Sequence, residues 1–159
     1  MDKKIRWGFL GCGKVVQKKS GEAFRSVPNS EIAVIMRRNL EAAKESAEHF
    51  GAPVWCDNIE ELLSEADACG VKVFLGNGFY GDWRKADHNI KSQDVIDRSF
   101  RAMEELTALY SHHESFFGWY FPDETCIILN YSKDFMKYVN LCSARCHELT
   151  PDKKTLIAP

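Results

Sequence analysis

Three glycines near the start of the chain offer a backbone arrangement that can bind an anion. Residues 5–16 read Ile-Arg-Trp-Gly-Phe-Leu-Gly-Cys-Gly-Lys-Val-Val and run from an apolar strand through the glycines into an amphipathic helix. Because they lack a side chain, Gly11 and Gly13 let the backbone come close to a ligand, and the first N–H groups of the helix favour a group such as pyrophosphate. The residues predicted to bind it are Gly11, Cys12, Gly13, Lys14 and Val15.

The glycine spacing matches only part of the G-x-G-x-x-G pattern of dinucleotide-binding turns. Gly11 and Gly13 occupy its first two positions, whereas Val16 stands where a third glycine would let the helix lie close to the strand. A tight turn from strand to helix that binds no ligand would show the same local pattern. Both interpretations therefore stay open.

The rest of the chain alternates between strands and helices. Asn39 is placed to cap one helix and Gly51 to end it. Residues 76–92 form a loop whose length is typical of a functional or mobile segment. Apolar spacing predicts later strands at 31–36, 54–55, 71–75, 116–121 and 155–158, and helices at 14–25, 40–50, 59–66, from 92 or 94 to about 110, and 132–149.

This alternation predicts a parallel α/β protein with right-handed crossovers. We expect a doubly wound, Rossmann-like three-layer sandwich, a single domain with six mostly parallel strands in the order 3-2-1-4-5-6. Ligands of such folds bind beyond the carboxyl ends of the strands. The polar, charged or glycine-rich segments at those ends are 11–13, 37–38, 56, 77–82 and 122–124.

Composition excludes several classes of partner. With 159 residues, of which 45% are hydrophobic and 28% charged, the chain suits a globular protein. A net charge of −2 supplies no basic field for nucleic acid, and no apolar run reaches the roughly 20 residues of a membrane span. The amino-terminal residues lack a signal peptide, so we expect a cytoplasmic protein. None of the six cysteines forms a C-x-x-C pair, which favours buried thiols over a metal site, Cys142 and Cys146 included.

Residues 1–67 resemble a known nucleotide-binding half-domain. The matching segments are 6–16, Met-Arg-Arg-Asn at 36–39 and Asp-Asn-Ile-Glu-Glu-Leu-Leu at 57–63. They resemble the amino-terminal half of the Rossmann domain in the glucose–fructose oxidoreductase/inositol dehydrogenase family, which binds NAD or NADP. Arg37 and Arg38 stand where an acidic residue would select a free ribose 2′-hydroxyl, so the resemblance implies NADP, whose 2′-phosphate a guanidinium can clasp. Two solvated arginines at a strand end remain the alternative.

Residues 70–159 resemble a different kind of protein. The segments 70–83, 105–110, 116–124 and 149–159 are similar to parts of glycosidase-like bacterial (β/α)₈ barrels. That resemblance implies a catalytic acid or nucleophile at Glu124, with Asp82 or Asp123 nearby. A surface carboxylate at a strand end is the alternative, since glycoside hydrolysis needs two carboxylates across one bond and only about three barrel strands are present.

Neither half contains a complete reaction centre. The Glu-Lys-Pro motif of the first family occurs nowhere in the sequence. We therefore expect an engineered hybrid of a Rossmann-derived half, 1–68, and a barrel-derived half, 69–159, that is not an enzyme and retains weak binding of NADP, NAD or another small anion. The alternatives are a truncated cofactor domain of an NADP-dependent oxidoreductase and a glycosidase-like fragment that uses Glu124. An open sheet edge would also favour a homodimer.

Overall fold

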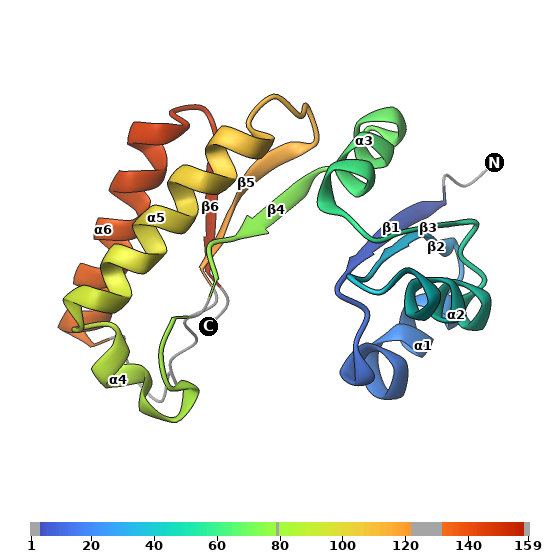
Figure 1. The fold of residues 1–159 in the computed structure, drawn as a ribbon, viewed down its shortest axis with the longest axis horizontal. Coiled ribbons are helices and arrows are strands. Elements are labelled where there is room, and N and C mark those ends of the chain that lie inside the picture. The colour runs from blue at the N-terminus through green and yellow to red at the C-terminus, as the bar shows by residue number, and fades with distance from the viewer. Residues whose placement is uncertain (1–3, 79, 122–131, 158–159) are drawn as a thin grey trace. The chain divides into compact units, whose positions relative to one another are not determined.

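A computed structural model describes residues 4–78, 80–121 and 132–157 (Figure 1). Parallel strands alternate with helices along the chain, as the sequence predicts. The strands are β1 (Ile5–Leu10), β2 (Ser30–Met36), β3 (Val54–Cys56), β4 (Val73–Gly76), β5 (Phe116–Phe121) and β6 (Lys154–Ile157). The helices are α1 (Gly21–Ser26), α2 (Leu40–Phe50), α3 (Ile59–Cys69), α4 (Ala86–Asn89), α5 (Gln93–Tyr110) and α6 (Lys133–Leu149), with a π-helical turn η1 (Val16–Ser20) and a 3₁₀ turn η2 (Trp83–Lys85).

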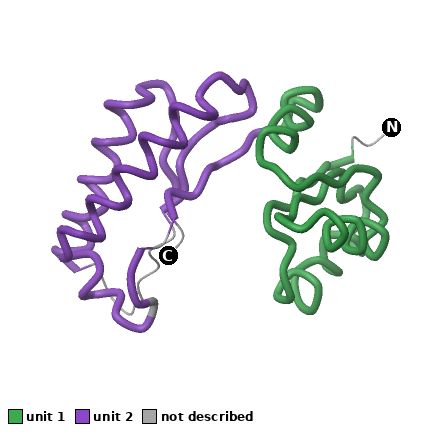
Figure 2. Tube along the Cα trace, viewed as in Figure 1, with its two compact units in different colours: residues 1–71 green, residues 72–159 purple. Residues whose placement is uncertain are grey.

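The chain divides into two compact units, residues 1–71 and 72–159 (Figure 2). One contains a parallel sheet of order β1-β2-β3, and the other a parallel sheet of order β4-β5-β6. The α/β class and the strand order within each half are thus confirmed. The structure divides the chain after residue 71, close to the boundary that the sequence predicts after residue 68. The origin of the two halves in two different families stays a prediction.

The predicted topology is confirmed within each unit. The described strands pair in two three-stranded sheets, one in each unit. A right-handed β-α-β connection brings consecutive strands side by side, so local pattern predicts each three-strand order. The joining of the two sheets into one six-stranded sheet stays a prediction.

The first unit is built around β2. Residues 32–36 of this strand are all buried. In Figure 1, α1 and α2 lie on one side of its sheet and α3 on the other, which is the doubly wound arrangement. The core cluster contains Cys12, Ile32, Ile35, Ala47, Phe50 and Ala52, with Phe9, Val16 and Phe24 packed against it.

The helix boundaries of the first unit follow their capping residues. Asn39 Oδ1 accepts a hydrogen bond from Ala42 N at 2.8 Å, and Gly51 ends α2 with a left-handed φ of 73°. Both roles were predicted and are confirmed. Asn58 caps α3 in the same way, and α3 continues to Cys69 before Gly70, three residues beyond the predicted end.

The second unit packs α5 and α6 together beside a sheet whose central strand is β5. Trp119 of β5 is fully buried and donates a hydrogen bond from Nε1 to Thr150 Oγ1 at 2.9 Å. The expected loop at 76–92 contains η2 and α4. Both are too short to show a helical repeat of apolar residues, which is why the sequence pattern missed them.

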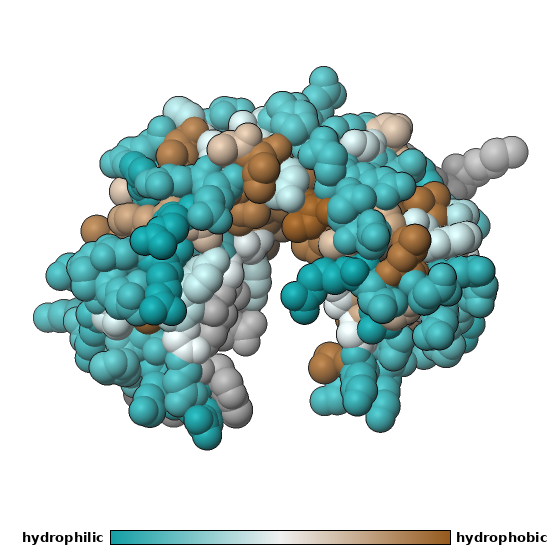
Figure 3. Space-filling model, in the orientation of Figure 1, coloured by the Kyte–Doolittle hydropathy of each residue, from teal (hydrophilic) through white to brown (hydrophobic). Residues whose placement is uncertain are grey.

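Hydrophilic residues cover most of each unit on the face shown in Figure 3, with hydrophobic residues scattered among them. Within the described part of the chain, no helix is long and apolar enough to cross a membrane. Exposed large apolar residues include Ile5, Leu10, Val15 and Val27 in the first unit and Leu109, Met136, Leu141 and Leu156 in the second.

Candidate functional site

The glycine turn after β1 has the conformation that its sequence predicts. Gly11 has a φ of +75°, which strongly favours glycine, and its N–H donates to Met36 O at 2.9 Å. Gly13 N–H then donates to Gly11 O at 2.7 Å. A Cβ added at Gly11 would meet no atom within 4 Å, and one at Gly13 only Gly11 O at 3.8 Å. The outer side of the turn is therefore open to a ligand.

A helical segment begins directly after the turn. Gln17 N–H donates to Gly13 O at 3.1 Å, and helical structure continues from Lys14 to Ser26. The amides of residues 14–16 precede that first helical hydrogen bond, so they belong to the group of N–H donors that a helix leaves unsatisfied at its start. Lys14 and Val15 are exposed there. These amides provide the partial positive charge expected of an anion site.

A cleft of about 450 Å³ lies beyond the carboxyl ends of β1 and β2. Its volume is within the usual range for small-molecule sites, roughly 300 to 1,000 Å³. The cleft joins the glycine turn to the segment after β2 and to the start of α3. Its lining residues are Leu10, Gly11, Gly13, Met36, Arg37, Arg38, Asn39 and Ile59.

The two arginines after β2 have different environments. Arg37 is half-buried, and its Nη1 donates to Ala42 O and to Ser46 Oγ, both at 3.1 Å. Arg38 is exposed, and its side chain makes no hydrogen bond or ion pair with any residue that the structure describes. The sequence treated the two residues as equivalent phosphate ligands. The geometry leaves the guanidinium of Arg38 available, while the side chain of Arg37 is bound to α2.

Cys12 lies in the turn, but its side chain belongs to the core. The residue is fully buried. Burial raises the pKa of the Cys12 thiol, and this effect exceeds the opposing effects of a hydrogen bond with Ser46 and of the Arg37 charge. The thiol is therefore neutral at physiological pH, and Cys12 can offer a ligand only its backbone.

Two residues that matter here were missed by the sequence reasoning. Gly21 is buried, and a Cβ added to it would lie 2.6 Å from Phe50 Cε1 and 2.7 Å from Val16 O. A close approach of helix to core thus occurs at Gly21, after the π-helical turn, and not at Val16 where the third glycine was expected. Ser46 is a fully buried polar residue on α2. The available signals were a glycine inside the predicted helix 14–25 and a serine on the apolar face of the predicted helix 40–50.

The carboxylates predicted in the second half do not form a described pair. Asp82 accepts a hydrogen bond from Arg84 N at 3.1 Å and forms an ion pair with Arg84 Nε at 3.0 Å. These interactions lower the pKa of the Asp82 carboxyl, with the side-chain hydrogen bond from Arg84 as the main cause. A general acid needs a raised pKa, so Asp82 is unsuited to that role. Glu124 and Asp123 lie outside the described residues.

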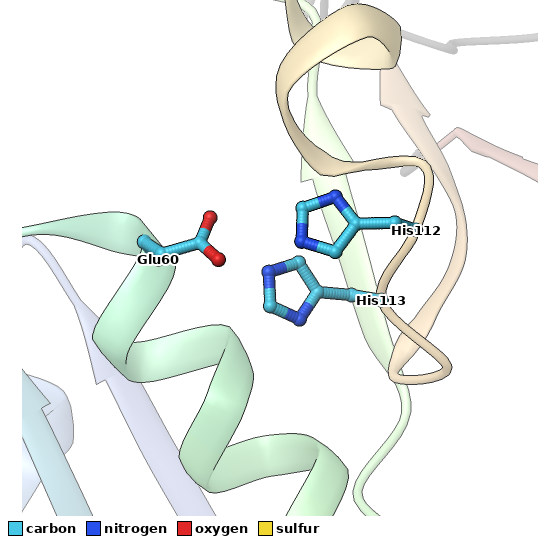
Figure 4. A group of neighbouring side chains, drawn as sticks. All are labelled: Glu60, His112 and His113. Carbon is cyan, nitrogen blue, oxygen red and sulfur yellow. The ribbon is translucent and has the colours of Figure 1, made fainter.

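Histidine and cysteine side chains in the second unit show local packing. The rings of His112 and His113, which follow α5, have centroids 4.2 Å apart (Figure 4). Glu60, also drawn there, belongs to the first unit and lies in the first turn of α3. Cys142 and Cys146 are buried free thiols on α6. Burial raises the pKa of Cys146 to about 12, as expected of a thiol in an apolar interior.

The fold and the cleft define a parallel α/β protein with a glycine turn at the carboxyl edge of its first sheet. Residues 27–159 match the family described as "Domain of unknown function (DUF4434)". The chain belongs to this family.

This chain matches parts of several longer proteins. A segment of 63 residues is 40% identical to "Oxidoreductase P35" of Formosa agariphila, and covers 40% of this chain and 20% of that protein. The 3-ketoreductase KijD10 of Actinomadura kijaniata, solved with NADP and TDP-benzene, is 19% identical, with a TM-score of 0.44 over 90% of this chain and 35% of its own. The WlbA dehydrogenase of Chromobacterium violaceum, solved with NADH and UDP-GlcNAcA, is 17% identical, with a TM-score of 0.44 over 99% of this chain and 36% of its own.

Proposed function

We propose that residues 1–71 bind NADP and that the chain acts as a cofactor-binding part of an oxidoreductase. The observation that carries the proposal is the cleft, which connects an open glycine turn with Arg38, whose guanidinium has no partner among the described residues. The Formosa agariphila relative is named as an oxidoreductase, which supports the same class. The chain spans only a fifth of that relative, so the activity of a whole enzyme is part of the proposal.

The residues present fit the phosphate groups of a dinucleotide. The space beside Gly11 and Gly13, where any other residue would place its side chain, is open. The backbone amides of residues 14–16, which follow the turn, have no helical partner and are available to a ligand. These amides would hold the pyrophosphate. Arg38, which follows the second strand, stands where doubly wound folds contact the adenosine ribose, and would bind its 2′-phosphate. Ile59 supplies an apolar wall of the cleft.

The chain's own residues are proposed to bind and orient the cofactor. When bound, NADPH supplies a hydride to an acceptor. Asp82 is held ionised by Arg84, so it is not assigned as a proton donor. The proposal therefore assigns cofactor binding to this chain and assigns no catalytic residue.

Calorimetric titration of the full chain with NADP and with NAD tests the proposal. We expect NADP to bind more tightly, because a charge-assisted hydrogen bond contributes about 1.5 to 3 kcal/mol, which corresponds to roughly tenfold or more in affinity. Arg38→Ala should remove this preference. The matched control is Arg101→Ala, which changes an exposed arginine on α5. Absence of heat with either cofactor at millimolar concentration would refute the proposal.

The hybrid origin and the homodimer stay predictions. The chain divides near the boundary drawn from sequence, while the family match runs from 27 to 159 and crosses it. Whole-chain relatives encoded in many genomes would contradict an engineered origin. Light scattering would measure the oligomeric state. The use of Glu124 in glycoside hydrolysis is likewise a prediction, which an aryl glycoside assay of Glu124→Gln would test.

A further inference from the structure

A buried serine connects the glycine turn with the helix and strand around it. Ser46 Oγ accepts hydrogen bonds from Arg37 Nη1 at 3.1 Å and from Gln17 Nε2 at 3.2 Å, and donates one to Ala42 O at 2.8 Å. Cys12, which lies in the glycine turn, is fully buried in the same core cluster as Ala47, the neighbour of Ser46 on α2. Ser46 is fully buried, so these bonds replace water for an otherwise costly polar group.

The hydrogen-bond partners of Ser46 come from two segments at the phosphate end of the cleft. Gln17 lies in the helical segment after the glycine turn, and its backbone N–H donates to Gly13 O at 3.1 Å. Arg37 is the first residue after β2, and its backbone N–H donates to Cys56 O at 3.1 Å. A single hydroxyl group thereby ties the helical segment that follows the turn and the end of β2 to α2.

The same contacts determine what Arg37 can do. Its Nη1 is shared between Ser46 Oγ and Ala42 O, which holds the guanidinium against α2. In this position the arginine supports the turn through Ser46 and Gln17. Its neighbour Arg38 has no such anchor among the residues described and remains exposed.

We propose that Ser46 and Arg37 are positioning residues, which fix the glycine turn for the diphosphate, while Arg38 alone recognises the 2′-phosphate. This inference rests on the proposed function, because it concerns the same cleft. It predicts that loss of Ser46 or Arg37 weakens every diphosphate ligand by the same factor. Loss of Arg38 should weaken only ligands that carry a 2′-phosphate.

The affinities for NADP and NAD separate the two roles. Ser46→Ala and Arg37→Ala should each lower both affinities about three- to tenfold and leave their ratio unchanged, as expected for a neutral or charge-assisted hydrogen bond. Arg38→Ala should reduce the ratio roughly tenfold. Ser64→Ala, an exposed serine on α3, is the matched control. A fall in the NADP to NAD ratio for Arg37→Ala, as large as that for Arg38→Ala, would overturn the proposal.

A second measurement does not depend on nucleotide binding. Alkylation of Cys12 by iodoacetamide, followed by peptide mass spectrometry, reports how firmly the turn is held. Ser46→Ala should raise the rate at Cys12 several-fold and leave the rate at buried Cys146 of the second unit unchanged. An unchanged rate at Cys12 would overturn the positioning role. If neither cofactor binds, the proposed function fails, whereas this rate still decides the role of Ser46.

Global unfolding of a variant would raise the rate at both thiols. In that event the variant Gln17→Ala tests the positioning role. It removes the hydrogen bond that the half-buried Gln17 side chain donates to Ser46, and it leaves the serine in place. Faster labelling at Cys12 alone supports the proposal, and equal labelling of wild type and Gln17→Ala at Cys12 contradicts it.

Discussion

Replacing Gly21 by alanine should destabilise the first unit, although alanine is the better helix former. In a helix interior, alanine is favoured over glycine by about 0.8 to 1 kcal/mol. At this position, however, the added Cβ would lie 2.6 Å from Phe50 Cε1 and 2.7 Å from Val16 O. The ring can move only within a filled core, since Phe50 is 3% exposed, and the carbonyl belongs to the backbone.

The steric cost should exceed the gain in helix propensity. Overpacking a core costs roughly 1 to 3 kcal/mol, and this contact involves a backbone atom as well as a buried ring. The expected net loss in the free energy of unfolding is up to about 2 kcal/mol, the overpacking cost less the gain in helix propensity. Because the helix that contains Gly21 starts at the glycine turn, the shift should also weaken binding at the cleft.

Urea unfolding followed by circular dichroism measures this loss. Ser20→Ala, at an exposed neighbouring position, should be neutral or stabilising by a few tenths of a kcal/mol and serves as the control. Combining Gly21→Ala with Phe50→Leu should cost less than the sum of the two single changes, because the smaller side chain relieves the contact. If Gly21→Ala stabilises the protein as Ser20→Ala does, the helix does not approach Phe50 as closely at Gly21 as the structure shows, which refutes this prediction.

Three further changes test the fold around and beyond the site. Asn39→Ala should lower the free energy of unfolding by about 1 kcal/mol, because it removes the cap on Ala42 N. Trp119→Phe should cost about 2 kcal/mol through the lost bond to Thr150 and the lost volume. Burial raises the pKa of Cys56 from 9.0 to about 11, so the unfolded state loses its proton first and stability should fall as pH rises from 9 to 11.

Each of these measurements has its own control. Asp is an equally good capping residue, so Asn39→Asp should retain most of the stability that the alanine variant loses. Trp119→Phe with wild-type stability would mean that the buried bond contributes nothing. In urea titrations, the free energy of unfolding of Cys56→Ala should decline less between pH 9 and 11 than that of the wild type. An identical decline would mean that groups other than Cys56 cause the loss of stability at alkaline pH.

Much of the fold and part of the site could be predicted from local patterns. The cap at Asn39, the helix end at Gly51 and the open turn at Gly11 each depend on a few neighbouring residues. The buried strand at 31–36 was recognisable because a strand covered on both faces is apolar throughout. For Arg37 and Arg38, the sequence predicted two arginines after this strand, and the family resemblance implied that they bind a 2′-phosphate, without distinguishing one from the other.

The sequence by itself determined the alternation of strands and helices, their caps and the glycine turn, because these depend on backbone preferences over a few residues. Only the tertiary structure decided that Arg37 is held by Ser46, that Arg38 makes no hydrogen bond or ion pair with the described residues, and that the close approach of helix and core occurs at Gly21. The physical reason is that these outcomes depend on which distant atoms meet. A hydrogen bond between residues nine positions apart leaves no periodic signal in the chain.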